Sequence, residues 1–129
     1  MDESLVLQVI ERARSAAAKD GLKVCISVVD ASGLMSGFLR MDDALPGSID
    51  VSMKKARTAA LFRCDSADIG QRACPGGIIY TLEATNGGMI SFGGGVTIKD
   101  DSGKVIGAVG ISGASVDQDQ AIALYAAGR

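Results

Sequence analysis

The stretch SFGGGVTIKDDSGKVIGAVGISGAS, residues 91–115, decides the fold because it alternates branched residues with turn residues and many glycines. Its central DDSG (residues 100–103) has the composition of a tight β-turn, which predicts a hairpin between strands at residues 96–99 and 105–112. An antiparallel sheet is therefore the expected centre of the fold.

The glycines of this stretch have two different explanations. In the second strand, a period of two puts the small residues Ala108, Gly110 and Ser112 on one face, which favours a helix or ligand that approaches the backbone closely. Gly107, on the other face, is also best explained by a close approach of neighbouring structure. Three consecutive glycines, Gly93, Gly94 and Gly95, exceed what a positive φ requires in a turn, and binding loops concentrate in such turns. We expect this turn to face a ligand. No Gly-Lys-Ser/Thr triplet occurs, which disfavours a nucleotide phosphate cradle.

Further helix and strand signals lie on both sides. An apolar stripe followed by glycine predicts a helix over residues 5–19, and the turn at residues 30–33 predicts a second hairpin. Ser115, with Gln118 three residues later, forms a capping-box pattern for a last helix. The other expected elements are helices at 48–62 and 65–72 and strands at 22–30, 34–41, 78–82 and 89–92. The fold class is α/β (α+β): one domain, residues 1–129, with an antiparallel sheet of about five to six strands flanked by helices.

Composition disfavours several function classes. Thirteen basic and fifteen acidic residues give a net charge of −2, and only 4% of residues are aromatic, so no nucleic-acid surface is expected. No uncharged apolar run reaches the length of a signal peptide or membrane span, which predicts a cytoplasmic protein without membrane contact. The three cysteines are odd in number and far apart, and histidine is absent, so we expect neither a disulfide framework nor a metal site.

Five sequence blocks occur in an order that resembles the GlcG/HbpS family, the haem-binding and haem-degrading-type domain also found at the C-terminus of some corrinoid adenosyltransferases. The blocks are ISVVDASG (26–33), KARTAALF (55–62), PGGIIY (75–80), NGGMISFGGGVTIKD (86–100) and GKVIGAVGISGASVDQDQAIA (103–123). Each block is weak by itself. Their common order covers essentially the whole chain and makes the resemblance specific.

The resemblance implies a profilin-like or Roadblock-like domain that assembles into homo-oligomers. It also implies a small-molecule pocket near the start of the second helix and the glycine-rich turn, and relatives are described as binding haem or cobalamin. Leu34 stands where relatives often carry histidine, and Thr97 where they commonly have proline. Haem iron is usually held by His, Cys, Met or Tyr, so without that histidine we expect no cofactor, with haem or another tetrapyrrole disfavoured.

Four polar residues are candidates for contact with a ligand or for proton transfer. Arg40 and Asp42 follow the first hairpin, Lys55 lies beside the apolar stripe of the second helix, and Glu83 lies in a turn. A lysine drawn toward a pocket can pair with a ligand carboxylate or, with its pKa lowered by desolvation, act as an acid or base. Asp119, by contrast, is interpreted as a solvated charge at the start of the last helix.

Two hypotheses remain open. The preferred one is a non-catalytic small-molecule-binding protein, accessory to catabolism or cofactor handling, whose anionic ligand is held by Arg40, Lys55 and the turn at residues 93–95. The alternative is a cofactor-free isomerase, tautomerase or hydratase acting on a small carboxylate, in which Asp42, Glu83 or Lys55 moves the proton. Without histidine or a recognisable nucleophile–base pair, triad hydrolysis and zinc chemistry are not expected.

Overall fold

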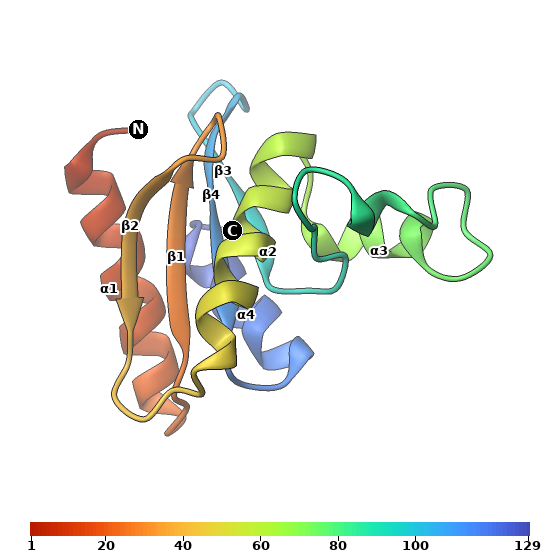
Figure 1. The fold of residues 1–129 in the computed structure, drawn as a ribbon. Helices are drawn as coiled ribbons and strands as arrows, with labels where there is room; N and C mark the ends of the chain where they lie inside the picture. The colour runs from red at the N-terminus through yellow and green to blue at the C-terminus, as the bar shows by residue number, and fades with distance from the viewer.

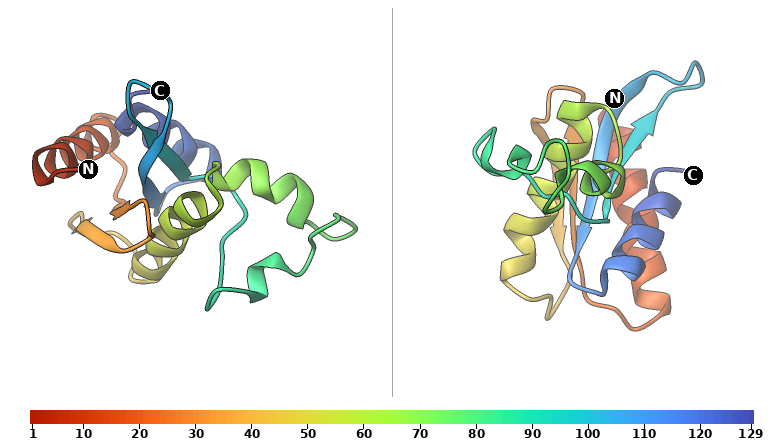
Figure 2. Two further views of the ribbon diagram at one scale, coloured as in Figure 1. Left: turned by 90° about the horizontal axis from the view of Figure 1, so that it is seen from above. Right: turned by 90° about the vertical axis from the view of Figure 1, so that its right-hand side faces the viewer.

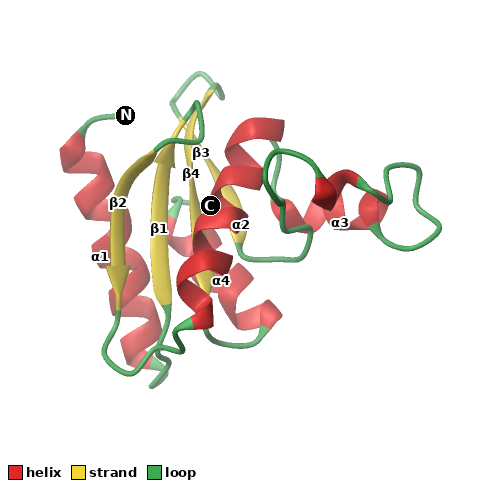
Figure 3. Ribbon diagram, viewed as in Figure 1, coloured by secondary structure: helices red, strands yellow, loops and turns green.

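The computed structural model describes all residues, 1–129, and shows a mixed α+β domain (Figures 1 and 3). Its central sheet has four antiparallel strands in the order β2-β1-β4-β3. The elements in chain order are α1 (Glu3–Lys19), β1 (Cys25–Asp30), β2 (Met35–Arg40), α2 (Gly47–Phe62), α3 (Ser66–Ala73), the 3-10 turn η1 (Leu82–Ala84), β3 (Gly95–Lys99), β4 (Val105–Ser112) and α4 (Val116–Ala126).

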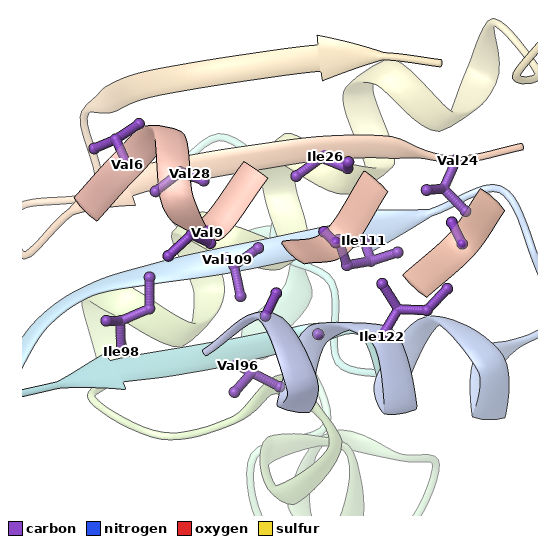
Figure 4. Close-up of a cluster of buried hydrophobic side chains, with 14 residues drawn as sticks. Val6, Val9, Val24, Ile26, Val28, Val96, Ile98, Val109, Ile111 and Ile122 are labelled. Atoms are coloured by element: carbon purple, nitrogen blue, oxygen red, sulfur yellow. The ribbon is translucent and has the colours of Figure 1, made fainter. Parts of the chain in front are cut away.

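The main hydrophobic core lies between one face of the sheet and the helices α1 and α4, which pack against each other. The strands contribute branched side chains from alternate positions, among them Ile26, Val109 and Ile111, and the helices contribute small or branched residues such as Val9 and Ile122 (Figure 4). Alternation along the strands sends every second side chain to this face. The remaining strand residues therefore face α2.

Helix α2 packs unusually close to the opposite face of the sheet, because that face carries small residues. A Cβ added to Gly110 would lie 2.0 Å from the backbone oxygen of Ser52, and one added to Gly95 would lie 2.2 Å from that of Lys55. Alanines 56, 59 and 60 of α2 complete a second, smaller core with Val29 and Ala108. The glycine-rich strand face was thus correctly predicted to admit a close approach, and the partner is helix α2.

The prediction of five to six strands was wrong, because residues 78–82 and 89–92 form no strand. With α3 they make an arm, residues 66–92, that extends away from the sheet (Figures 1 and 2). Its backbone is bonded locally or to side chains: Leu82 N donates to Ile79 O, and Ile90 N donates to the Thr58 hydroxyl. No strand with a free edge lies beside either segment, so neither segment pairs into the sheet in spite of its β-propensity.

The two edges of the sheet differ. At the β3 edge, the outward N–H groups of Gly95 and Thr97 donate to the side chains of Ser66 and Asp65, which begin α3. Arg129 pairs with the same Asp65 at 2.8 Å. At the opposite edge, no described element covers the outer side of β2 (Figure 2).

The helices of this protein are too short or too polar to cross a lipid bilayer.

Candidate functional site

Lys55 lies inside the protein, where α2, β4 and α4 meet. Its side chain is 1% exposed, and its ammonium donates to the backbone oxygen of Ile111 at 2.7 Å and to Asp119 Oδ2 at 3.1 Å. The ring of Phe92 lies 5.0 Å from the same nitrogen, in cation–π contact. Two of the three ammonium N–H groups therefore already have acceptors within the protein, and the buried side chain is not open to a ligand from outside.

Asp119 is the second half of this buried ion pair. The sequence-based interpretation of a solvated charge was wrong: Asp119 is only 2% exposed. Its Oδ1 accepts the N–H of Ala114 at 3.0 Å, in the turn that leads from β4 into α4, while Oδ2 faces Lys55. The physical reason is the side of the helix on which it lies: Asp119 faces the end of β4, whereas Asp117, two residues earlier, is exposed.

Burial shifts both groups of the pair away from their charged forms. Desolvation lowers the pKa of Lys55, and the charge of Asp119 opposes this shift. Desolvation likewise raises the pKa of Asp119, opposed by the charge of Lys55 and by the N–H of Ala114. Because both charges are buried, removing either one would leave the other without a counter-charge, at a high cost in the free energy of folding.

The glycine turn at residues 93–95 contacts the protein's own helices. A Cβ on Gly93 would meet the Gln120 side chain at 3.2 Å, and one on Gly94, whose φ is +121°, would meet the Lys55 ammonium at 2.6 Å. Gly94 N also donates to Gln120 Oε1 at 2.8 Å. The structure therefore brings Lys55 and this turn together, as the sequence predicted, but it packs them tightly, without a cavity between them.

The other predicted site residues lie elsewhere. Arg40 and Asp42 line a shallow depression of about 230 Å³ with Arg14 and Lys23, at the end of β2. Arg40 donates through Nε and Nη2 to the backbone oxygen of Ala44. The expectation that these residues cluster with Lys55 was wrong, because the hairpin end and the middle of α2 lie on different parts of the sheet.

Glu83 lies in the arm, where its carboxylate accepts the N–H of Ser91 at 3.3 Å. It is exposed and shares neither the depression beside Arg40 nor the surroundings of Lys55. The predicted proton-transfer residues Asp42, Lys55 and Glu83 therefore occupy three separate places.

A different site was not singled out from the sequence: a groove between the β1–β2 hairpin and α2. It encloses about 110 Å³ and is lined by Val29, Gly33, Leu34, Met35, Met53 and Arg57. Four of these are apolar side chains, and Arg57 is the one charged group. A larger depression of about 340 Å³ beside Tyr125 is lined mainly by polar residues of the α1 surface. Apolar walls with one charged group are typical of small-molecule sites, so the groove is the better candidate.

Two sequence signals point to this groove. Met53 and Arg57 are four residues apart and therefore project from the same side of α2. Leu34, at which relatives often carry histidine, lies in the hairpin that forms the facing wall. Arg57 also donates to the backbone oxygen of Asn86 at 3.2 Å, which ties one end of the groove to the arm.

The sequence matches the family described as "Haem degrading protein HbpS-like" over residues 1–128. An uncharacterized 15.0 kDa protein of Citrobacter freundii is 44% identical over 101 residues, which cover 78% of this chain and 70% of that protein. The corrinoid adenosyltransferase PduO of Salmonella typhimurium is 41% identical over 101 residues, which cover 78% of this chain but only 30% of PduO.

A solved structure gives the same fold. The crystal structure of a PduOC:haem complex superposes with a TM-score of 0.93 at 35% identity, over 99% of this chain and 93% of that one. The family resemblance inferred from five ordered sequence blocks is thereby confirmed. This chain belongs to the HbpS-like family.

Proposed function

We propose that this protein binds a flat, largely apolar small molecule that carries a carboxylate, of the tetrapyrrole class, in the groove between the β1–β2 hairpin and α2. The observation that carries the proposal is the lining of the groove, which consists of four apolar side chains and one guanidinium. Apolar walls hold a flat ring by burial, and Arg57 offers a charge-assisted partner for a carboxylate. The haem complex of a relative that is 35% identical supports this ligand class.

The size of the groove fixes how such a ligand would lie. About 110 Å³ accommodates only one edge of a tetrapyrrole, since pockets that enclose drug-sized ligands measure roughly 300–1,000 Å³. The groove is therefore suited to a ring that inserts one edge between Met35 and Met53 and leaves its other edge outside. The Arg57 guanidinium keeps further N–H donors for a carboxylate because only one of its nitrogens bonds to Asn86.

The donor set of the groove does not favour strong ligation of iron. Haem iron is held most often by histidine, and this chain has none. The groove offers only the thioethers of Met35 and Met53, which are more often packing residues than ligands. The ring and carboxylates of haem fit the groove better than its metal does, so we propose that binding depends on packing and charge.

Titration with hemin should therefore give only a broad, weakly perturbed Soret band in the wild-type protein. Protoporphyrin IX without metal should bind with a similar affinity, because the contacts are to the ring and its carboxylates. Met53→Glu should weaken both ligands by about tenfold or more, since it buries a charge against the ring. Ile78→Glu, at an exposed apolar position on the arm, is the matched control and should leave both affinities unchanged.

Leu34→His supplies the missing imidazole on the groove wall. We expect this variant to sharpen the Soret band with hemin and to leave protoporphyrin IX binding near wild type, because only the metal gains a ligand. A sharp low-spin spectrum for the wild-type protein at one equivalent of hemin would contradict the proposal. Unchanged porphyrin binding in Met53→Glu would show that the ligand lies outside the groove.

The alternative of a cofactor-free isomerase, tautomerase or hydratase gains no support from geometry. Its proposed proton-transfer residues lie apart, and Lys55 is engaged by Asp119 and Ile111. The groove itself contains no carboxylate or lysine. We therefore keep binding, and not turnover, as the proposed function.

A further inference from the structure

We propose that a second small-molecule site lies between α1, the end of β3 and the C-terminal end of α4, and that it binds a short-chain monocarboxylate. Arg12 and Lys99 hold the carboxylate, and the hydrocarbon part packs against apolar residues of the two helices and the strand. The site shares no lining residue with the groove beside the β1–β2 hairpin, so the inference does not depend on the function proposed for that groove.

The site is a cleft of about 100 Å³ with an apolar floor. Val9 and Ile98 line it; both are residues of the main core, and they are 2% and 3% exposed (Figure 4). Its apolar lining is completed by Leu5, Ala126 and Ala127. A hydrocarbon group in this cleft leaves water for a surface that is continuous with the core, which is favourable.

The charged residues of the cleft are all positive. They are Arg12 of α1 and Lys99, the last residue of β3, and no aspartate or glutamate lines the cleft. Neither cation forms an ion pair within the chain. Two unpaired cations above an apolar floor favour an anion that carries a hydrocarbon part.

Helix α4 holds Arg12 in place. Its Nη2 donates to the backbone oxygen of Tyr125 at 2.9 Å, and its Cζ lies 4.9 Å from the centre of the Tyr125 ring. A cation at a helix C-terminus is favourable in itself, so capping of α4 explains this part of the side chain. A guanidinium has five N–H donors, however, and the bond to Tyr125 uses only one of them.

The Nε–H of Arg12 is not explained by capping. Among the buried side-chain nitrogens and oxygens of the protein, only Arg12 Nε has no hydrogen-bond partner. A buried donor without an acceptor costs free energy, and native proteins almost always satisfy such groups. Nε and one Nη nitrogen form the side of a guanidinium that binds a carboxylate through two hydrogen bonds. A carboxylate in the adjoining cleft supplies this acceptor after a small rotation of the Arg12 side chain.

The volume of the cleft limits the ligand to a small molecule. About 100 Å³ corresponds to the space of roughly three water molecules, at about 30 Å³ each. A monocarboxylate with about two to four carbons fits this space, whereas a tetrapyrrole or any other ligand of drug size does not. Propionate is therefore a suitable probe, and formate, which has the carboxylate without the hydrocarbon part, is its matched comparison.

NMR titration with sodium propionate at constant ionic strength tests the site directly. We expect saturable shifts of the Arg12 Nε–H signal and of the backbone amides of Lys99 and Gly128, which border the cleft. Formate should bind about tenfold more weakly, because it gains nothing from the apolar floor. Propylamine has the opposite charge and 1-propanol has none, so neither should give saturable shifts at these positions.

Three variants assign the binding to the two cations. Arg12→Met should weaken propionate binding by about tenfold or more, and Lys99→Met by about threefold, since an exposed cation contributes less than a buried one. Arg14→Met is the matched control: Arg14 lies on the same helix, pairs with Glu11 and does not line the cleft, so the affinity should stay unchanged. Lys99 is exposed, so its variant keeps the test valid if loss of the Tyr125 contact unfolds Arg12→Met.

Three results would overturn the proposal: no saturable shift with propionate, equal affinities for propionate and formate, or equal weakening by Arg14→Met and Lys99→Met. The first would show that the cleft binds no short-chain carboxylate. The second would show that the apolar floor takes no part, and the third that only the overall positive charge matters. All three are read from signals beside α1 and α4, so they are independent of the porphyrin titrations.

Discussion

Replacing Lys55 by methionine should destabilise the protein by about 3–5 kcal/mol, which is the usual cost of removing one partner from a buried ion pair. Methionine keeps most of the side-chain volume, so the loss comes from Asp119, which stays buried without its cation. The backbone oxygen of Ile111 also loses its donor. Urea unfolding followed by circular dichroism measures the difference in the free energy of unfolding between wild type and variant. An unchanged m value would show that the difference comes from the stability of the folded state.

Asp119→Asn and the double variant separate the cost of an unpaired buried charge from the loss of the ion pair itself. Asparagine can still accept the N–H of Ala114, so the single change removes mainly the charge that faces Lys55. Each single variant leaves one buried charge without its partner, whereas the double variant Lys55→Met/Asp119→Asn buries no charge. The destabilisation of the double variant should therefore be smaller than the sum of the two single effects. If Lys55→Met instead unfolded within about 0.5 kcal/mol of wild type and lost porphyrin binding, the lysine would be a ligand contact, as the sequence suggested.

Acid should lessen the defect of Lys55→Met. Without its cation, Asp119 has a folded-state pKa raised further above its unfolded value by desolvation. Between those two values the folded protein binds more protons than the unfolded chain, so stability falls as pH rises through that window. The difference between wild type and variant should therefore shrink from about pH 7 to about pH 4, measured by urea unfolding at each pH.

The parts of the fold that the sequence predicted correctly are those with local signals. The turns at residues 30–33 and 100–103 form hairpins, and each aspartate at the first position accepts N–H groups of its own turn. Ser115 and Gln118 form the expected capping box. Such patterns depend on chemistry within four residues, so no tertiary information is needed to recognise them.

The strands that were predicted wrongly lie where tertiary contacts, and not local sequence, determine the structure. Residues 78–82 contain branched and aromatic residues typical of a strand, yet Ile79 N donates to Arg72 O within the arm and no partner strand is near. Strand propensity describes a residue that fits a half-buried sheet, and it cannot supply the sheet. The two strands counted in excess came from this error.

In the candidate site, too, local features were predicted correctly and contacts between distant segments were not. Sequence reasoning placed Lys55 near the turn at residues 93–95, but it could not show that Asp119, 64 residues away in sequence, completes a closed ion pair. It also did not single out Met53, because only the fold shows that this side chain of α2 lines a groove beside the β1–β2 hairpin. Burial depends on what packs on top of a residue, which no single segment specifies.

Gly110→Ala should cost about 3 kcal/mol or more, a large effect for adding one methyl group. The backbone of Gly110 has no positive φ, so strain is not the reason. The new Cβ would lie 2.0 Å from the backbone oxygen of Ser52 and 2.7 Å from the backbone nitrogen of Ala56. Backbone atoms in the middle of a helix cannot rotate away, so α2 as a whole must move off the sheet and loosen its contacts with Val29 and Ala108.

Gly47→Ala is the matched control for this change. Gly47 begins α2, has no atom within 4 Å of a built Cβ, and does not have a positive φ. Alanine there should be neutral or stabilise by about 0.4–1 kcal/mol, through the lower entropy of the unfolded chain. Thermal unfolding of the two variants, with Gly95→Ala as a second close-contact position, distinguishes crowding from loss of glycine itself. Gly110 and Gly47 variants of equal stability would mean that α2 does not press on β4, and close packing of the helix would then not explain the glycine-rich strand.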